Sequence, residues 1–346
     1  MVVFGAGASY DSIPHVRSPN APYRLPLGDQ LFDDRVDFSK WIERFKRCNA
    51  VIPYLRNLPQ GSSVESQLEG LRKEAETNPT RHKQLSAVQF YLQSMIWECE
   101  DNWNREQAKG VSNYKTLLDQ IESWRREVNE TVCFVTFNYD RMLENALLDV
   151  DINIQNIGDY VKSEAYKIIK LHGSVDWGHE VATELDIAGR RYLDVANDLI
   201  ERRSFLRVSE DFCIVLGRLG SEDSIDVDDP GPPVFPALAI PVENKQDYEC
   251  PEEQIKVLQT CIPKVTKMVL IGWRATETHF LELLKARLRK KITVKAVNGG
   301  QKSEKETVNR LASALDQAGI STAPVPSNVG FSDFVISRQI EGFLRS

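Results

Sequence analysis

Short apolar runs that each end at a glycine or polar cluster are the feature that most constrains the fold of this chain. Runs of this kind, rich in β-branched and aromatic residues, are typical of strands buried on both faces of a parallel sheet. The runs are Val2–Phe4, Val132–Phe137, Ile168–Leu171, Met268–Ile271 and Ile292–Val297. Helical patterns follow three of them, at Arg141–Leu148, Thr278–Arg289 and Glu304–Ala318, the last with a stop at Gly319. This alternation predicts an α/β fold with a Rossmann-like doubly wound parallel sheet.

Two long stretches interrupt the alternation and are predicted to be insertions. Residues 33–129 form a large helical insertion, with helices expected over Trp41–Leu55, Val64–Glu76, Leu85–Asn102 and Tyr114–Val128. Residues 175–241 form a second, mixed insertion, with a helix at Tyr192–Arg203 and an acidic loop, Gly220–Pro233. The acidic spacing does not match an EF-hand, which favours a mobile solvated loop over a calcium site. The predicted core domain is therefore residues 1–32, 130–174 and 242–346.

Composition indicates which classes of partner and which cellular compartment to expect. The formal net charge of -7 does not attract polyphosphate backbones, and the short basic stretch Lys285–Lys291 fits a solvated helix face, so we expect nucleic acid only through a partner. Four apolar residues before the first glycine are too few for a signal-peptide core, and no run has the length of a membrane span. None of the six cysteines is spaced as C-x-x-C, which predicts reduced thiols, no metal site and a cytoplasmic protein without membrane contact.

The first candidate site is the sequence Gly5-Ala6-Gly7-Ala8-Ser9, directly after a predicted strand. Glycines let a backbone approach a pyrophosphate closely, and the start of the next helix complements its charge. The third glycine of G-x-G-x-x-G is absent, so a tight turn without a ligand fits this motif equally well. For Ser9, capping of the following helix is an equal alternative to phosphate binding.

The second and third candidate sites also follow predicted strands, where an open α/β sheet places its ligands. In Thr136-Phe137-Asn138-Tyr139-Asp140, Asn138 and Asp140 are suited to orienting a water or binding an amide, although Asp140 as a helix cap and Asn138 as a turn residue are alternatives. In Lys170-Leu171-His172-Gly173-Ser174, His172 is a candidate base or partner of a ribose hydroxyl, while a structural histidine is the alternative.

In this order the three motifs resemble the sirtuin family, whose members carry G-A-G-x-S, T-Q-N-x-D and H-G on a Rossmann-like sheet. Two later segments agree with the resemblance, Leu270-Ile271-Gly272-Trp273 near the ribose and Val297-Asn298-Gly299 near the adenosine. The zinc module of sirtuin deacylases, with its two C-x-x-C pairs, has no counterpart here, and Phe137 replaces the glutamine of T-Q-N. The chain is therefore most similar to the sirtuin-like (SIR2-like) NADase branch of bacterial antiphage defence, and no zinc is expected.

The resemblance implies NAD as the substrate and a role for each matching residue. Asn138 and His172 would be catalytic, Asn138 by positioning the attacking water and His172 by binding a ribose hydroxyl and accepting a proton. Asp140 would bind the carboxamide of nicotinamide. The remaining cofactor-binding residues would be Gly5, Ala6, Gly7, Ser9, Gly272, Trp273 and Asn298.

The function implied is that of an NAD⁺ glycohydrolase, which cleaves the nicotinamide–ribose bond to ADP-ribose and nicotinamide as the effector of an antiphage system that depletes NAD. A deacylase or ADP-ribosyltransferase at the same site is the alternative, and a non-catalytic sensor of NAD or ADP-ribose is a second. The resemblance also implies a homo-oligomer and a HerA-like ATPase or another defence partner. The helical insertion and the acidic loop are the candidates for gating the activity.

Overall fold

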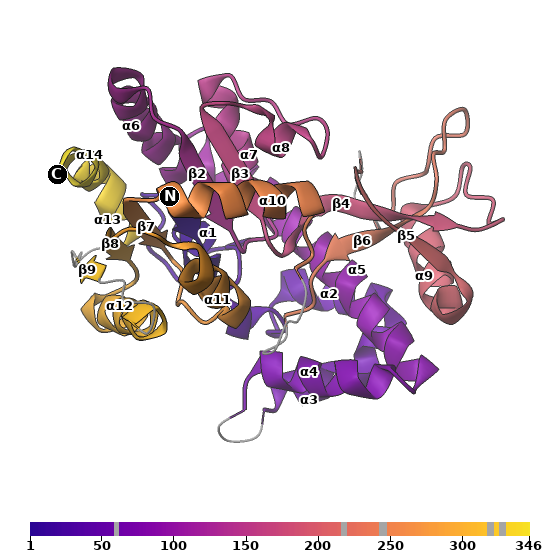
Figure 1. Cartoon of the computed structure of the whole chain (residues 1–346). Coiled ribbons are helices and arrows are strands. Elements are labelled where there is room, and N and C mark those ends of the chain that lie inside the picture. Colours follow the sequence, from indigo (N-terminus) through magenta and orange to yellow (C-terminus); the bar gives the residue numbers. More distant parts are fainter. Residues whose placement is uncertain (59–61, 216–219, 242–247, 317–321, 325–329) are drawn as a thin grey trace. The chain divides into compact units, whose positions relative to one another are not determined.

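The computed structural model describes residues 1–58, 62–215, 220–241, 248–316, 322–324 and 330–346, and the chain forms two compact units (Figure 1). Unit 1 comprises Met1–Leu25, Asn102–His172 and Cys250–Ser346, and unit 2 comprises Pro26–Asp101 and Gly173–Glu249. Both predicted insertions thus contribute to unit 2. The end of the predicted helical insertion, from Asn102 to Asn129, belongs to unit 1 instead. The boundary predicted at residue 242 and the helix stop at Gly319 lie outside the described residues.

Unit 1 is built on one six-stranded parallel sheet. Its strand order is β3 (Tyr166–Lys170), β2 (Val132–Thr136), β1 (Val2–Phe4), β7 (Lys267–Ile271), β8 (Ile292–Val297) and β9 (Thr322–Pro324). The predicted α/β fold with a Rossmann-like parallel sheet is confirmed, and each of the five predicted strands is present, with bounds shifted by at most two residues.

Burial on both faces explains why these runs form strands. All five residues of β2 and all three of β1 are buried, so an apolar side chain is favoured at every position rather than at every second one. On one face the rings of Phe4, Phe134 and Tyr166 form a continuous row, with centroids 5.9 and 5.5 Å apart across neighbouring strands. This aromatic row is the core between the sheet and its first helical layer.

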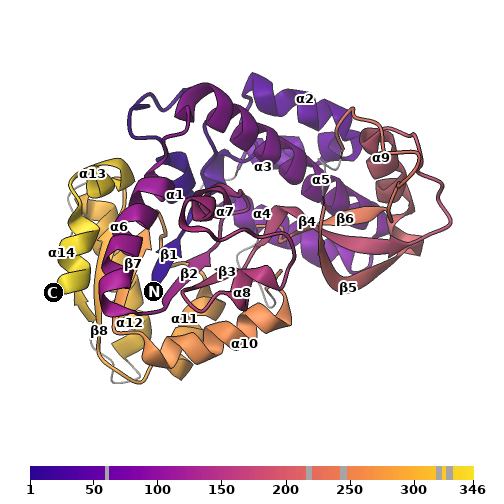
Figure 2. The ribbon, with the colours of Figure 1, turned by 90° about the horizontal axis from the view of Figure 1, so that it is seen from above.

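Helices cover both faces of the sheet, as the doubly wound topology requires. In Figure 2, α6 (Asn113–Val128) and α7 (Met142–Leu147) lie on one side of the sheet. The helices α10 (Glu252–Cys261), α11 (Thr278–Arg287) and α12 (Gln301–Asp316) lie on the other. The chain order reverses at β1, which lies between β2 and β7, and the carboxyl end of such a reversal is where open α/β sheets bind ligands.

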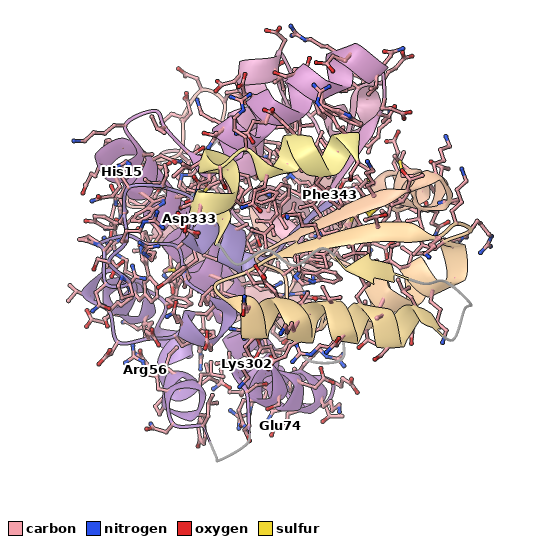
Figure 3. All side chains as sticks on the ribbon, turned by 90° about the vertical axis from the view of Figure 1, so that its left-hand side faces the viewer. His15, Arg56, Glu74, Lys302, Asp333 and Phe343 are labelled. Carbon is pink, nitrogen blue, oxygen red and sulfur yellow. The ribbon has the colours of Figure 1, made fainter. Side chains whose placement is uncertain are left out.

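Short helices complete unit 1. They are α1 (Ala6–Tyr10), α8 (Asp159–Lys162), α13 (Phe331–Ile336) and α14 (Gln339–Arg345). Figure 3 shows the side of the molecule that carries α13 and α14, with Asp333 and Phe343 labelled. The Asp11 carboxylate just after α1 accepts hydrogen bonds from the Ser332 hydroxyl at 2.6 Å and the Ser332 N–H at 3.0 Å. This contact holds the C-terminal helices to the end of the first helix.

Unit 2 combines helices with a small antiparallel sheet. The helices are α2 (Val36–Arg44), α3 (Ile52–Arg56), α4 (Val64–Ala75), α5 (Pro79–Asn102), which runs one residue beyond the unit, and α9 (Tyr192–Arg202). The sheet has the order β5 (Arg207–Ile214), β4 (Gly173–Ala182), β6 (Val234–Leu238). The single helix predicted over Trp41–Leu55 is wrong, because the backbone leaves helical geometry at Phe45 and Pro53 begins a new helix at α3.

The acidic loop of unit 2 is attached by its first half to the start of α9. Backbone hydrogen bonds run from Tyr192 N to Asp223 O at 3.0 Å and from Leu193 N to Ser221 O at 2.8 Å. The Arg191 guanidinium adds an ion pair to Glu222 at 2.8 Å. The remaining acidic side chains of the loop, Asp226, Asp228 and Asp229, are exposed. No helix in the described ranges is both long and apolar enough to span a lipid bilayer.

The carboxylate of Glu122 on α6 provides a test of the packing of unit 1. It accepts hydrogen bonds from Arg125 at 2.6 Å and from the Tyr166 hydroxyl at 2.5 Å, and these partners, Arg125 first, lower the pKa of Glu122 to about 2. Because the pKa is lower in the folded chain, the stabilisation is present above the usual value near 4.5 and is lost as the pH falls toward 2.

We expect Glu122→Gln to reduce the free energy of unfolding at pH 7 by about 2 kcal/mol, since it leaves Arg125 without its charged partner. Urea unfolding of both proteins at a series of pH values measures this. The difference should shrink as the pH falls from 4.5 toward 2. A difference that stays constant over this range would show that the carboxylate charge does not stabilise α6.

Candidate functional site

The candidate site lies along the carboxyl edge of the parallel sheet. The register pairs Phe4 with Thr136 and Ile271, Thr136 with Lys170, and Ile271 with Val297, so five strands end at one level. The predicted site residues in unit 1 follow these ends within a few positions. Parallel register therefore places the three motifs, and the segments at Gly272 and Asn298, along a single edge.

The glycine loop after β1 packs directly against the turn after β7. Gly5 N donates to Ile271 O at 3.0 Å, and Gly7 N donates to Gly272 O at 3.1 Å. Gly272 has a φ of +62°, and a Cβ there would lie 2.1 Å from Ala8 N. This contact between two main chains accounts for the glycines without a ligand. Phosphate binding by Gly5, Ala6 and Gly7, and ribose binding at Gly272, remain predictions.

Ser9 lies inside α1 and faces a buried polar cluster. Because α1 begins at Ala6, the alternative that Ser9 caps the start of this helix is wrong. Its Oγ lies 3.0 Å from the hydroxyl of Tyr114, and both groups are buried. Tyr114 comes from α6, more than a hundred residues further along the chain, and the sequence analysis assigns it no role.

Asn138 joins the same cluster from the end of β2. Its Nδ2 donates to Ser9 Oγ at 2.9 Å and to Tyr114 OH at 3.2 Å, and its backbone N–H donates to Thr136 Oγ1 at 3.0 Å. The side-chain oxygen Oδ1 is buried, and among the described residues no group donates a hydrogen bond to it. An unpaired buried acceptor costs free energy, so a group that donates a hydrogen bond is favoured at this oxygen.

Asp140 is buried beside these groups. Its Oδ1 accepts from Met142 N at 3.1 Å, at the first residue of α7. The N-cap position of this helix is Arg141, so Asp140 contacts the start of the helix from one residue before the cap that the sequence predicts. Burial raises the pKa of Asp140, while the Lys170 ammonium and hydrogen bonds from Ser9 and Met142 oppose that rise. The carboxylate is therefore linked to the Ser9 hydroxyl and, through it, to Asn138. Recognition of a nicotinamide carboxamide by Asp140 stays a prediction.

Lys170 is a buried cation at the end of β3 that the sequence analysis leaves without a role. Its Nζ lies 2.8 Å from Glu144 Oε1 and donates to the backbone oxygen of Asp140 at 2.6 Å. The Tyr160 hydroxyl donates to the same Glu144 oxygen at 3.0 Å. Lys170 thus fixes the loop that carries Asn138 and Asp140.

His172 lies against an aromatic cluster that begins at Phe137. The Phe137 ring is 5.0 Å from the His172 ring in an edge-to-face arrangement and stacks on Trp273 at 5.5 Å. The ring of Phe280 lies 5.5 Å from the Phe137 ring and 5.5 Å from the Trp273 ring. Trp273 is only 2% exposed and its indole N–H donates to Glu277. Phe137 thus forms an apolar wall beside His172.

Asn298 follows β8 and is held by α12. Its Nδ2 donates to Thr307 Oγ1 at 3.0 Å, and the preceding residue accepts a hydrogen bond from Gly272 N at 2.9 Å. Asn298 is 6% exposed. The structure therefore connects this turn to the Gly272 turn, and its predicted contact with adenosine remains a prediction.

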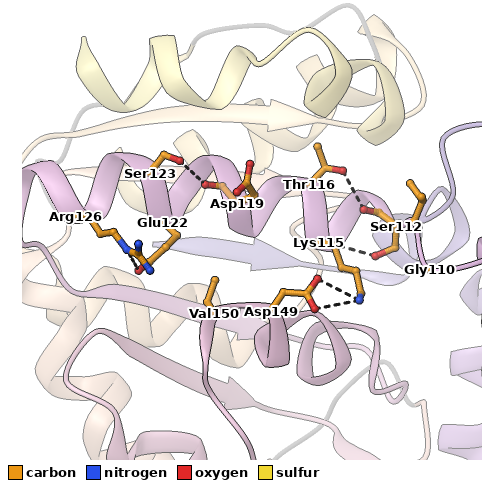
Figure 4. Close-up of a pocket in the computed structure, with 11 residues that line it drawn as sticks. Gly110, Ser112, Lys115, Thr116, Asp119, Glu122, Ser123, Arg126, Asp149 and Val150 are labelled. Atoms are coloured by element: carbon orange, nitrogen blue, oxygen red, sulfur yellow. Dashed lines mark hydrogen bonds and ion pairs between the residues drawn. The ribbon is translucent and has the colours of Figure 1, made fainter.

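A cavity of about 510 Å³ lies elsewhere in unit 1, on the outer face of α6 (Figure 4). It is bordered by α6, the turn at Asp149 and Val150, and the segment before α6, and it contains the ion pair of Lys115 with Asp149 at 3.1 Å. None of the predicted site residues lines it. Tyr114 lies on the opposite, buried side of the same helix, so the outer cavity and the candidate site are separate features.

Metal ligands are not clustered in the part of the chain that the structure describes. Within those residues no group of three or more His, Cys, Asp or Glu side chains could hold a metal ion.

Comparisons with known proteins give distant matches only. No protein-family model matches the chain, and no curated protein matches it. Among solved structures, a Sir2 protein with a p53 peptide and NAD⁺ is 13% identical, with 99% of this chain and 92% of that chain covered and a TM-score of 0.39. Sir2 bound to an acetylated peptide gives the same values, and Sir2Tm bound to a propionylated peptide is 14% identical over the same shares, with a TM-score of 0.38. Likeness this distant establishes no shared activity, so the site is interpreted from its own geometry.

Proposed function

We propose that this protein is an NAD⁺ glycohydrolase that cleaves the nicotinamide–ribose bond of NAD⁺ with water. The observation that carries the proposal is the orientation of Asn138, whose amide nitrogen is held by two hydroxyls while its buried oxygen has no partner in the described part of the chain. A water or ribose hydroxyl that donates to this oxygen would satisfy it. The site lies at the carboxyl end of the strand reversal, where dinucleotides bind in open α/β sheets.

The reaction needs positioned groups more than covalent catalysis. The bond from the anomeric carbon to nicotinamide breaks, and its electron pair leaves on the nicotinamide nitrogen, which neutralises that ring. The ribose carbon passes through an oxocarbenium-like state, and the oxygen of a water bonds to it. Asn138 Oδ1 orients that water, and the water's proton passes to the His172 imidazole, which acts as the general base. The products are ADP-ribose and nicotinamide.

The remaining residues hold the substrate in this proposal. The backbone of Gly5, Ala6 and Gly7 binds the pyrophosphate, and Asp140 faces the nicotinamide carboxamide. The Lys170 ammonium pairs with the Glu144 carboxylate at 2.8 Å and interacts electrostatically with the Asp140 carboxyl group, so two carboxyl groups share this cation. A site with this charge balance favours the cationic nicotinamide ring of NAD⁺ over the neutral ring of NADH.

The biological role follows from the motif resemblance and is proposed on that basis. We infer an effector of antiphage defence in the cytoplasm that depletes NAD, assembles as a homo-oligomer and is controlled by a HerA-like ATPase or another defence partner. An unrestrained NADase would damage its own cell, so the helical segment and the acidic loop are the proposed gating elements. Light scattering tests the assembly, since a monomer at all concentrations would contradict it.

Nicotinamide release from NAD⁺ alone is the experiment that tests the activity. The purified chain is incubated with NAD⁺, and nicotinamide and ADP-ribose are quantified by chromatography, with and without an acyl-lysine peptide. We expect equal amounts of both products without the peptide, because water is the acceptor. Release only with the peptide, with acyl-ADP-ribose as the product, would identify a deacylase. Recovery of bound NAD⁺ unchanged would identify a sensor.

A further inference from the structure

We propose that Tyr114 is a positioning residue that fixes the side-chain amide of Asn138 with its oxygen directed toward the reacting water. The inference rests on the proposed NADase function and adds to it a residue from α6 that carries no sirtuin-like motif. Its basis is the buried cluster of Ser9, Tyr114, Asn138 and Asp140, in which each side chain hydrogen-bonds to at least one other.

The donors and acceptors of this cluster have a defined direction. The hydrogen bond from Ser9 favours the ionised form of Asp140, so in that form the Ser9 hydroxyl donates and the carboxylate accepts. Ser9 Oγ then has only acceptor capacity left, and it accepts from Tyr114 OH at 3.0 Å and from Asn138 Nδ2 at 2.9 Å. Tyr114 OH, having donated its proton to Ser9, also accepts from Asn138 Nδ2 at 3.2 Å. A flipped amide would place its oxygen against these two hydroxyls and lose both bonds.

Tyr114 is held firmly enough to serve as this anchor. It is 2% exposed, its ring lies 5.1 Å from the Phe4 ring, and Phe331 packs against it edge-to-face at 5.5 Å. Burial raises the pKa of Tyr114 well above its usual value, so the phenol keeps its proton at neutral pH. The hydroxyl therefore has a fixed place and a fixed donor role.

The two anchors of Asn138 have different origins. Ser9 belongs to the glycine-loop helix, whose position the sheet determines. Tyr114 belongs to α6, which begins where Ser112 caps the helix by accepting from Lys115 N at 3.2 Å. Loss of the Tyr114 hydroxyl leaves the Asn138 amide with one hydrogen-bond partner, Ser9, so the amide can rotate and Oδ1 no longer points toward the reacting water. The backbone of Gly5, Ala6 and Gly7, which is proposed to bind the pyrophosphate, is not altered by this change.

Tyr114→Phe tests the proposal because it removes one oxygen atom and keeps the ring packing. We expect kcat for nicotinamide release to fall about 10-fold, with KM for NAD⁺ changed less than about twofold. Tyr166→Phe is the matched control, since it also removes a buried hydroxyl from unit 1, one that donates to Glu122. Its kcat should equal that of the wild type. Equal kcat in Tyr114→Phe and wild type would overturn the proposal.

A double variant separates positioning from a general structural effect. If Tyr114 acts through Asn138, Tyr114→Phe should lower the residual rate of Asn138→Ala no further, because the anchored amide is already absent. A structural effect of Tyr114→Phe would lower it by the same factor as in the wild type. That multiplicative outcome would also overturn the proposal.

If the wild type releases no nicotinamide, the proposed function is rejected, but the role of Tyr114 in holding Asn138 can still be tested by NMR. With asparagine labelled with ¹⁵N, Tyr114→Phe should shift the side-chain amide signals of Asn138. Those of Asn113, whose amide donates to Ser332 Oγ at 2.8 Å, should stay in place and serve as the internal reference. Unchanged Asn138 signals would show that Tyr114 does not hold this amide.

Discussion

Asn138→Ala should lower nicotinamide release at least about 100-fold, because the variant loses the group that we propose orients the attacking water. The protein should remain folded, since Ser9 and Tyr114 keep their mutual hydrogen bond of 3.0 Å and both remain buried. The rate is measured by quantifying nicotinamide under saturating NAD⁺, and folding is checked by thermal unfolding. His172→Ala should have a similar effect on the rate, since it removes the group that accepts the proton.

Asn138→Asp is the more informative of the two variants at this position. It keeps the shape and an oxygen at the same position, yet it has no N–H to donate to Ser9 and Tyr114, and it places a second carboxylate near Asp140. We expect it to be as slow as the alanine variant. Wild-type rates in both Asn138→Ala and His172→Ala would show that the reaction takes place elsewhere or not at all.

Gly272→Ala should destabilise unit 1 by more than about 4 kcal/mol, which is an exceptional effect for one methyl group. The added Cβ would lie 2.1 Å from Ala8 N and 2.3 Å from the carbonyl carbon of Gly7, so two main chains would have to separate. Strain from the φ of +62° adds to the clash. Urea unfolding of the purified variant, or its loss from the soluble fraction, measures the effect.

Gly110→Ala is the matched control for backbone strain. Gly110 also belongs to unit 1 and has a φ of +88°, but a Cβ there meets nothing within 4 Å. We expect a cost of about 1 kcal/mol, the strain alone. If the two glycine variants unfold at the same urea concentration, the close approach of the Gly7 and Gly272 main chains does not contribute to stability.

The sheet and its edge could be predicted from the sequence because both depend on local patterns. A strand buried on both faces is apolar throughout, so runs such as Val132–Thr136 stand out from amphipathic helices. Once the strands are parallel and in register, the residues after each strand must share one edge. The placement of Asn138 and His172 at that edge follows from this rule, whereas their chemical roles remain predictions.

Tyr114 and Lys170 could not be predicted because their roles depend on contacts distant in sequence. In the sequence, Tyr114 is one of several apolar positions on an amphipathic helix. Only the packing of its ring against Phe4 of β1 brings its hydroxyl to Ser9. Lys170 needs Glu144 from α7 to be tolerated in the core. Neither the Tyr114–Ser9 contact nor the Lys170–Glu144 ion pair can be recognised from residues that are close in the sequence.

The strands of unit 2 were missed for a different reason. The sequence between residues 175 and 241 shows a helix and a loop, while β4 is irregular, with register shifts against both neighbours that interrupt its pattern. The exposed positions of β5 make its alternation weak. The buried strand β6 carries Pro236 at its centre, a residue that argues against a strand in the sequence.

The position of β1 in the sheet affects the order in which the edge of unit 1 can form during synthesis. β1 is made well before β7, its neighbour on one side, because the two strands are Val2–Phe4 and Lys267–Ile271. The glycine loop gains its hydrogen bonds only when the carbonyls of Ile271 and Gly272 are present, so a nascent chain that ends before β7 lacks the finished loop. If the loop binds NAD⁺ as proposed, activity must wait until β7 has left the ribosome.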